Sequence, residues 1–278
     1  MDPVSINNGL ALYRFGSGPE IFLMPYPHAS NYRSTADGRL AELLVNCGFT
    51  VITFDPPSFA RSPRPAKSDL QEMFETTTEC LNFFRVRQPL PFIGHSMAGF
   101  CTIAFTVENS GIASKLIISG SPSGWNDVLK YSIHKKWKPW QKKYWQSRYW
   151  GAKIILNKAS LKTHRQLDNL TNYECFYDKS FFEELAIGPD DHRTPPPPRA
   201  IWLRHVRKYN YGNRLNEIKI PVLITSGKFD PIVPLNVSQN MKNKIAGAEL
   251  FIFEKSGHSP FIEEPEKYSR IISKFLSG

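Results

Sequence analysis

Pro91-Phe92-Ile93-Gly94-His95-Ser96-Met97-Ala98-Gly99-Phe100 is the stretch of this chain that decides its fold. A short apolar run, typical of a buried strand, ends at Gly94, and a helix-compatible run begins at Met97. Only small residues fit two positions on either side of a nucleophile in so tight a strand-to-helix turn, and here these are Gly94 and Ala98. The pattern predicts a turn that raises the Ser96 hydroxyl above the sheet edge, at a helix N-terminus that favours negative charge.

The Gly-x-Ser-x-small pattern is weak evidence by itself, because an ordinary strand followed by a serine-capped helix gives the same residues. Two further residues change its weight: Asp230 and His258 follow later strands, in the chain order Ser, Asp, His. We therefore predict that Ser96 attacks an acyl carbonyl, that His258 acts as base and then acid, and that Asp230 orients the imidazole. The Met97 backbone N–H would be one oxyanion donor. Asp127 is a rival for the acid, but it fits the N-terminal turn of a helix better.

The overall composition is that of a folded globular protein. With 278 residues, 41% apolar and 22% charged, the chain can bury one large core or a core with an inserted subdomain. The N-terminus lacks a basic region followed by an apolar run, and no stretch approaches ~20 consecutive apolar residues. We therefore expect neither a secretory signal nor a membrane span, and a cytoplasmic protein is the default prediction.

The cysteines and histidines give no sign of a metal site. The four cysteines show no CxxC or Cys/His spacing, and three lie among apolar residues, as expected of free, buried thiols: Cys47, Cys80 and Cys101. Four histidines have no ligand-like spacing with carboxylates or cysteines: His134, His164, His192 and His205. We expect no metal and no other cofactor.

Charge divides the chain into two parts. Residues 121–215 hold 18 Lys and Arg against 8 Asp and Glu, together with all six tryptophans, whereas the remainder holds 17 of each sign. We predict a core domain formed by residues 1–120 and 216–278, and a basic, aromatic, helical lid formed by residues 121–215. The run Lys135–Lys143 could meet nucleic acid or anionic lipid, but a solvated helix face has the same pattern. Because no nucleic-acid motif accompanies the run, we expect no nucleic-acid partner.

Strands and helices of similar length alternate outside the predicted lid. We predict strands at residues 5–14, 20–24, 49–54, 91–94, 115–119, 220–225 and 249–253. We predict helices at residues 40–47, 69–84, 98–108, 235–245 and 265–276. Gly16-Ser17-Gly18-Pro19 reads as a hairpin-type turn between the first two strands. The alternation predicts an α/β fold with a mostly parallel sheet, whose ligands bind at the carboxyl ends of the strands.

The predicted lid has its own pattern. Trp137, Trp140 and Tyr144 recur at i, i+3 and i+7, which predicts an amphipathic helix whose aromatics form a small core. Pro195–Pro198 predicts a stiff, extended spacer, followed by a helix through residues 201–209. A basic, aromatic lid would recruit substrates with an acidic end; alternatively, its charge lies on the outer face and only keeps the lid soluble.

Four motifs resemble the α/β-hydrolase superfamily, and within it the lidded proline iminopeptidase-like and small-esterase group. They are the Ser96 turn, the acid turn Ser226–Pro234, the histidine loop Ser256–Pro265, and the loop Asp55–Ser62. In the last of these, Ser58 and Ala60 replace two family glycines. The resemblance covers roughly residues 10–64, 89–119 and 218–278, and implies an α/β-hydrolase core with an inserted lid.

The second oxyanion donor is where the chain departs from the family. Members commonly carry His-Gly-x after the strand equivalent to Ile21–Met24, and x donates an N–H. Here the turn is Pro25-Tyr26-Pro27-His28, and Pro27 has no N–H to give. We therefore assign Tyr26 as the donor. His28 would line the pocket or lie in a surface loop, and His95 is expected to face away from the nucleophile and pack.

The leading hypothesis is a cofactor-independent serine esterase for a small molecule with an apolar or aromatic part. An iminopeptidase-type aminopeptidase is the alternative, although the family's usual Gly-Gly-Ser-Trp-Gly-Gly turn is absent. It would need lid carboxylates for the substrate ammonium, with three candidates: Glu174, Glu183 and Glu184. A non-catalytic small-molecule receptor on the same fold is a third possibility. The pattern predicts neither the physiological substrate nor the oligomeric state.

Overall fold

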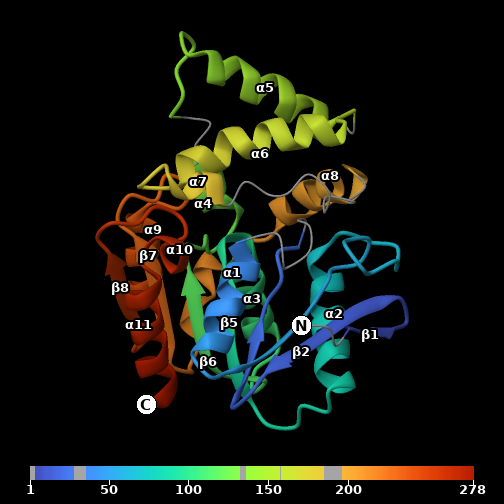
Figure 1. The fold of residues 1–278 in the computed structure, drawn as a ribbon, viewed down its shortest axis with the longest axis vertical. Coiled ribbons are helices and arrows are strands. Elements are labelled where there is room, and N and C mark those ends of the chain that lie inside the picture. Colours follow the sequence, from blue (N-terminus) through green and yellow to red (C-terminus); the bar gives the residue numbers. More distant parts are fainter. Residues whose placement is uncertain (1–3, 28–35, 132–135, 157, 185–195) are drawn as a thin grey trace.

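The computed structural model describes residues 4–27, 36–131, 136–156, 158–184 and 196–278. Within these ranges eight strands form one sheet in the order β1-β2-β4-β3-β5-β6-β7-β8 (Figure 1). The strands are β1 Val4–Asn7, β2 Leu10–Gly16, β3 Glu20–Leu23, β4 Thr50–Phe54, β5 Leu90–His95, β6 Ala113–Ser119, β7 Val222–Gly227 and β8 Glu249–Phe253. From β4 to β8 in this order the neighbouring strands are parallel, whereas β2 pairs antiparallel with both of its neighbours, β1 and β4. The predicted α/β class with a mostly parallel sheet is confirmed.

The first predicted strand, residues 5–14, is wrong as one element. Asn8 and Gly9 interrupt it with φ angles of 46° and 73°, and β1 folds back on β2 as a hairpin. Asn-Gly favours the left-handed conformation that such a two-residue turn needs. The predicted hairpin at Gly16–Pro19 is also wrong, because β2 and β3 lie on opposite sides of β4 and do not pair with each other.

Helices cover both faces of the sheet. The core helices are α1 Ala36–Asn46, α2 Leu70–Phe83, α3 Ser96–Glu108, α9 Leu235–Lys244, α10 Pro260–Glu263 and α11 Pro265–Ser277. Side chains of α2, α3 and α9 pack on one face, and those of α1, α10 and α11 pack on the other. Successive residues of β5 alternate between the two clusters, Phe92 joining the first and Ile93 the second, as strand geometry requires.

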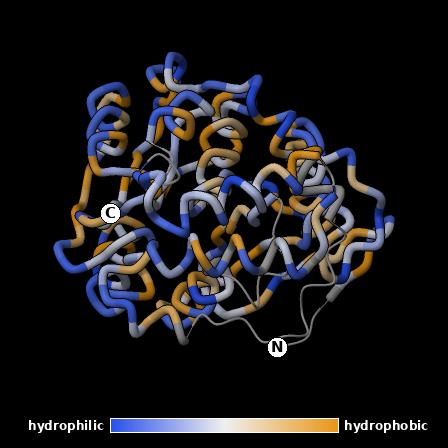
Figure 2. Tube along the Cα trace, turned by 90° about the horizontal axis from the view of Figure 1, so that it is seen from above, coloured by the Kyte–Doolittle hydropathy of each residue, from blue (hydrophilic) through white to orange (hydrophobic). Residues whose placement is uncertain are grey.

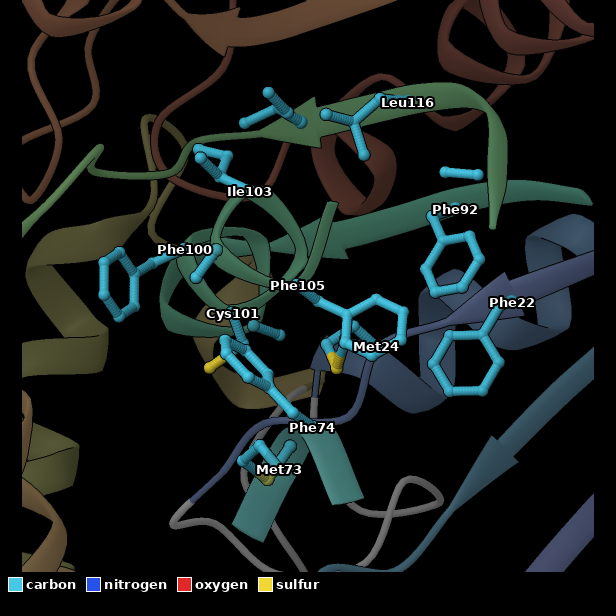
Figure 3. Close-up of a cluster of buried hydrophobic side chains, with 14 of the residues drawn as sticks. Phe22, Met24, Met73, Phe74, Phe92, Phe100, Cys101, Ile103, Phe105 and Leu116 are labelled. Carbon is cyan, nitrogen blue, oxygen red and sulfur yellow. The ribbon is translucent and has the colours of Figure 1, made fainter. Parts of the chain in front are cut away.

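The first of these clusters is rich in aromatic rings, and Figure 3 shows its side chains interdigitating between β5, α2 and α3. The Phe92 ring lies 4.8 Å from that of Phe22 and 5.6 Å from that of Phe105, measured between centroids. Figure 2 shows hydrophobic segments running through the interior and hydrophilic ones at the periphery. A dry, closely packed floor of this kind holds the Ser96 turn rigidly.

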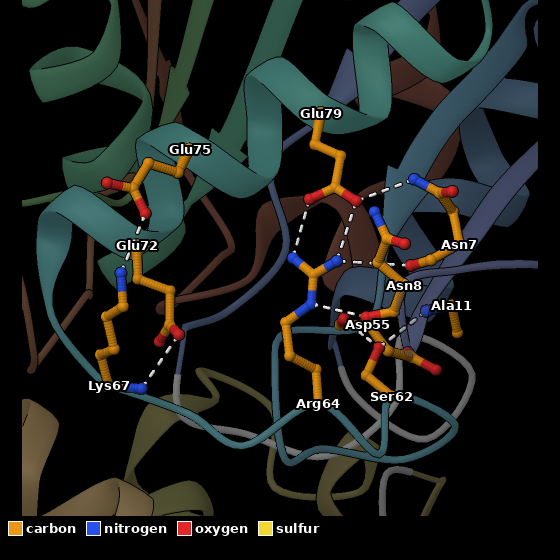
Figure 4. Close-up of polar contacts among 10 residues, drawn as sticks. All are labelled: Asn7, Asn8, Ala11, Asp55, Ser62, Arg64, Lys67, Glu72, Glu75 and Glu79. Atoms are coloured by element: carbon orange, nitrogen blue, oxygen red, sulfur yellow. Dashed lines mark hydrogen bonds and ion pairs between the residues drawn. The ribbon is translucent and has the colours of Figure 1, made fainter.

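Hydrogen bonds join the loop after β4 to β2 and to α2 (Figure 4). The Ser62 hydroxyl donates to the Asp55 carbonyl oxygen at 2.6 Å and accepts from the Ala11 N–H at 2.9 Å. Arg64 makes two bonds of 2.7 and 2.8 Å to the Glu79 carboxylate on α2. In the same loop Ser58 and Ala60 have φ angles of 65° and 45°, so the positions where relatives carry glycine keep the glycine-like backbone here.

Residues 120–221 lie between β6 and β7, and are called the insert. Its helices are α4 Trp125–Tyr131, α5 Lys142–Ile155, α6 Leu161–Cys175, α7 Phe181–Glu184 and α8 Pro196–His205, followed by short 3₁₀ turns at Val206–Lys208, Tyr211–Asn213 and Leu215–Glu217. Figure 1 shows these helices beyond the carboxyl ends of β5 and β6. The insert is helical, as predicted, while its role as a separate lid domain stays a prediction.

Two predictions inside the insert are wrong. Trp137 and Trp140 do not share a helix with Tyr144, because α5 begins only at Lys142, after Pro139. Trp137 is buried, whereas Trp140 is 82% exposed. Pro196–Pro198 are not an extended spacer but the first turn of α8, where the missing N–H groups have no helical acceptor to lose. Pro195 lies outside the described residues.

Candidate active site

The Ser96 turn has the strained geometry of a nucleophile elbow. Ser96 is the first residue of α3 and has a φ angle of 54°, a conformation that a non-glycine residue rarely adopts. The turn is tight enough to require its small residues, since a Cβ on Gly94 would lie 2.8 Å from the Ala98 backbone and 2.3 Å from the Thr102 hydroxyl. The predicted reason for a small residue at Gly94 is therefore visible in the packing.

His258 and Asp230 form a buried, directed pair. The Nδ1 of His258 lies 2.8 Å from Asp230 Oδ2. Because a carboxylate only accepts hydrogen bonds, Nδ1 carries the proton and donates it, which leaves the Nε2 lone pair available as a base. The other oxygen, Oδ1, accepts the N–H groups of Ile232 and Val233 at 2.8 and 2.9 Å. Asp230 is thus held on both oxygens and aims one of them at the imidazole.

The pair lies beside the Ser96 turn because the three strands that precede these residues are parallel and end at one edge of the sheet. Ser96 directly follows β5, whereas Asp230 and His258 lie in the loops that follow β7 and β8. The His95 ring, adjacent to Ser96 in the chain, lies 4.7 Å from the His258 ring between centroids. All three predicted triad residues are nearly inaccessible, at 7%, 5% and 7% exposed for Ser96, Asp230 and His258.

The two predicted oxyanion donors come from adjacent elements. Met97 is the second residue of α3, where backbone N–H groups have no helical partner. Tyr26 follows β3, which pairs with β5 so that Leu23 is opposite Ile93, and Met24 donates its N–H to the Ile93 carbonyl at 2.9 Å. Tyr26 follows this paired segment by two residues, and its role as a donor stays a prediction. His28 lies outside the described residues.

His95 has a contact that the sequence did not predict. It packs, as expected, against Phe261, with ring centroids 5.0 Å apart. Instead of facing away from the site, however, its Nε2 donates to the backbone carbonyl of His258 at 3.0 Å. Burial lowers the pKa of His95 well below its ordinary value, and the neighbouring His258 adds to the shift. A neutral His95 therefore holds the backbone of the loop that carries His258, the predicted base.

Protonation of His95 gives a testable pH dependence. The pKa of His95 is lower in the folded chain than in the unfolded chain. Below about pH 6.5, therefore, His95 binds a proton in the unfolded chain but stays neutral in the folded chain. His95 therefore contributes stability that is complete above pH 6.5 and is lost on acidification, at up to about 1.4 kcal/mol per pH unit. We expect His95→Gln, whose amide can still donate, to flatten the fall in unfolding free energy between pH 7 and 5.

Urea unfolding at a series of pH values measures this effect. The matched control is His205→Gln, because His205 is a partly exposed histidine of the insert that is far from the triad in sequence. Its pH profile should follow that of the wild type. Parallel profiles for the wild type and His95→Gln would contradict the assignment of a neutral, buried His95.

Glu263 is a second residue whose role was missed, although it lies in the quoted histidine loop. Its Oε1 accepts the Gly257 N–H at 2.6 Å, and its Oε2 accepts the Tyr177 N–H of the insert at 2.7 Å. Burial raises the pKa of Glu263, while these backbone donors oppose the rise. One carboxylate thus ties the insert to the loop that carries His258.

The same junction is closed by backbone contact. The His258 N–H donates to the Cys175 carbonyl at 2.7 Å, and a Cβ on Gly257 would lie 2.0 Å from that oxygen. Only glycine therefore permits the approach. The Tyr177 ring also stacks on Phe229 of the acid turn, with centroids 4.6 Å apart. The insert consequently contacts the loops of both the predicted acid and the predicted base.

Several other predicted residues are placed elsewhere. Asp127 lies in the first turn of α4, as predicted, and accepts hydrogen bonds from the Ser123 N–H and hydroxyl at 2.8 and 2.7 Å. Glu174 pairs with Lys143 at 2.6 Å, which occupies the carboxylate that an aminopeptidase would need. The side chains of the other two candidates lie outside the described residues, namely Glu183 and Glu184.

Two of the three cysteines that were expected to be buried are buried. Cys80 and Cys101 are buried free thiols, and burial raises the pKa of each well above its usual range. Cys47 is only partly buried, because it follows the last turn of α1 near the surface. In the part of the chain that the structure describes, no cluster of three or more His, Cys, Asp or Glu could hold a metal ion.

Comparison with known proteins agrees with this architecture. A family profile described as alpha/beta hydrolase fold matches residues 26–265. A 2-hydroxy-6-oxononadienedioate/2-hydroxy-6-oxononatrienedioate hydrolase from Dechloromonas aromatica is 26% identical over 94% of this chain and 88% of its own length. An alpha/beta fold family hydrolase from Bacillus anthracis superimposes with a TM-score of 0.78 at 20% identity, covering 96% of this chain and 95% of that one. An esterase from Exiguobacterium antarcticum gives 0.74 at 19% identity, covering 97% and 96%.

The profile covers most of the chain, and the chain therefore belongs to the alpha/beta hydrolase fold family. The predicted membership of the superfamily is confirmed, and with it the broad class of enzyme, a hydrolase.

Proposed function

We propose that this protein is a serine hydrolase that cleaves an ester or related acyl bond of a small molecule without a cofactor. The observation that carries the proposal is the buried His258–Asp230 pair, 2.8 Å apart, beside a serine held at a φ angle of 54°. A strained residue is retained in a turn when the strain serves a purpose. Aiming a hydroxyl at a base that is itself oriented by an acid is such a purpose.

In the first half-reaction the Ser96 Oγ attacks the substrate acyl carbon, and its proton passes to Nε2 of His258. The carbonyl oxygen becomes an oxyanion that accepts hydrogen bonds from the N–H groups of Met97 and Tyr26. Asp230 stabilises the imidazolium. When the intermediate collapses, the bond to the leaving group breaks, the leaving oxygen takes the proton from His258, and an acyl-Ser96 ester remains.

In the second half-reaction a water molecule attacks this ester. His258 takes one proton from the water as the C–O bond forms, and returns it to Ser96 Oγ as the acid product leaves. The burial of all three side chains supports the scheme, because electrostatic stabilisation is stronger where water is excluded.

A second candidate is hydrolysis of a 2-hydroxy-6-oxo dicarboxylic acid. It is favoured by the relative of that name, which aligns with 94% of this chain, and by the excess of basic residues in positions 121–215. The Ser96 Oγ would add to the 6-oxo carbonyl, the bond between C5 and C6 would break, C5 would take the proton from His258, and water would then hydrolyse the acyl-Ser96 ester. Cations of the insert would attract the carboxylates.

A substrate panel on the purified protein tests both candidates. The panel contains p-nitrophenyl acetate and butyrate, a 2-hydroxy-6-oxo dienedioate, and proline naphthylamide, with a fluorophosphonate probe added in parallel. We expect the probe to label Ser96, together with turnover of the esters or the dienedioate. Turnover of proline naphthylamide alone would select the aminopeptidase. No labelling and no turnover would leave a small-molecule receptor.

A further inference from the structure

One stretch of the insert carries only positive charge. Residues 128–167 contain eleven Lys or Arg and no Asp or Glu. Two of the cations in the described part of this stretch, Lys142 and Arg148, are exposed on α5. These two side chains of α5 are therefore available to a partner outside the substrate pocket.

Large apolar side chains are exposed in the same stretch. Trp140 is 82% exposed, Trp145 62%, Tyr149 59% and Leu156 64%. Single exposed apolar residues are ordinary, but this group falls within 17 consecutive residues of one helix and its flanking turns. A concentration of that kind marks a surface that meets another apolar phase or partner.

Helical geometry places three of these side chains, all but Trp140, in a single stripe with Ala152. Trp145, Tyr149, Ala152 and Leu156 recur at i, i+4, i+7 and i+11, which confines them to a sector of about 60° around α5. On the opposite side of the helix Ser147 and Ile154 are buried. Figure 1 shows α5 as the outermost helix of the insert, with α6 between it and the sheet.

Cations border the stripe on both sides. Lys142 and Lys153 follow one edge and Arg148 follows the other, at about 60–80° from Trp145 around the helix. The Lys153 ammonium lies 4.3 Å from the centroid of the Tyr149 ring, so its stem runs along the aromatic surface. Basic side chains that cover apolar surface with their stems can reach headgroups while the apolar stripe enters the lipid.

We propose that this face of α5, together with Trp140, docks on the surface of an anionic membrane. Trp and Tyr prefer the level of the headgroups, Leu156 would insert among acyl chains, and the basic borders complement acidic headgroups. A nucleic acid would use the cations but leaves the aliphatic and aromatic stripe exposed to water. No helix among the described residues could cross a membrane, so α5 would lie in the interface plane.

Vesicle co-sedimentation tests the proposal on the full-length protein. We expect binding to vesicles of phosphatidylcholine with phosphatidylglycerol, much weaker binding to phosphatidylcholine alone, and release by high salt. The double variant Lys142→Gln/Lys153→Gln should bind the anionic vesicles about 25-fold more weakly, at roughly fivefold per cation. Trp145→Gln/Leu156→Gln should weaken binding more than tenfold, since each exposed chain loses its transfer into lipid.

Matched control variants show whether vesicle binding depends on this face of α5 or on exposed cations and apolar side chains anywhere on the protein. Lys242→Gln/Lys255→Gln removes two exposed cations of the core, and Ile6→Gln/Phe83→Gln removes two exposed apolar side chains elsewhere. Both should bind like the wild type. Thermal unfolding checks that every variant is folded, so the test is independent of catalysis.

Absence of wild-type binding to anionic vesicles, or equal losses in the test and control variants, would overturn the proposal. So would binding to a DNA or RNA duplex that depends on Lys142 and Lys153 but is indifferent to Trp145 and Leu156, with no binding to vesicles.

Discussion

Replacement of Ser96 by alanine is expected to lower kcat/KM for the best ester of the panel by several orders of magnitude. The change removes only the attacking oxygen. Alanine keeps the Cβ that already tolerates the φ angle of 54° in this turn, so the fold should persist. Steady-state kinetics measure the loss, and mass spectrometry with the fluorophosphonate probe should show that the adduct disappears.

A neighbouring serine provides the control. Ser121 is also buried, lies just past β6 and donates its hydroxyl to the Ser119 carbonyl, so Ser121→Ala removes an oxygen of the same kind from the same edge of the sheet. It should keep its reactivity toward the probe. If Ser96→Ala retains turnover with unchanged kinetics, the nucleophile is another residue.

Local signals in the sequence were sufficient to predict most strands and helices of the core. The run Phe49–Phe54 was recognisable because buried parallel strands are short and continuously apolar or β-branched. The prediction of one strand over residues 5–14 is wrong because Asn8-Gly9, a strong turn signal, divides this segment into β1 and β2. The prediction that β2 and β3 pair across Gly16–Pro19 is wrong, because the residues of a turn do not determine which strand lies next to which in the sheet.

The candidate site divides in the same way. Chain order and strand ends were sufficient to predict Ser96, Asp230 and His258. The contacts of His95 and Glu263 were not predictable, because they join segments distant in the chain. The bond from His95 to His258 spans 163 residues, and the bond from Glu263 to Tyr177 spans 86. The first contact depends on how the loop after β8 closes over β5, and the second on how the insert folds over the sheet.

The insert resisted prediction for a different reason. The spacing of Trp137, Trp140 and Tyr144 predicts one helix, but Pro139 interrupts this segment and α5 begins only at Lys142. Pro196–Pro198 were assigned to an extended spacer, although the first turn of a helix accepts proline. In both places the residue type was informative, but only its position relative to a helix start decided its effect.

The second large effect is expected at the acid. Asp230→Asn should lower kcat by about four orders of magnitude, the size usual when a triad imidazole loses its acceptor. Asparagine has one carbonyl oxygen, but Asp230 uses two, one for His258 and one for the N–H groups of Ile232 and Val233. An amide that satisfies the turn presents its NH₂ to Nδ1, which forces the proton onto Nε2 and removes the base.

The rival acid is the matched control for this prediction. Asp127 uses a single oxygen, Oδ2, to accept the Ser123 N–H and hydroxyl, and the carbonyl of Asp127→Asn can accept both. We therefore expect Asp127→Asn to keep kcat within a few-fold of the wild type, whereas Asp230→Asn loses it while both variants unfold cooperatively. kcat measured across pH 6 to 9 decides the matter, because a displaced tautomer is not rescued by raising the pH. The opposite ranking of the two variants would move the catalytic acid from the end of β7 to the start of α4.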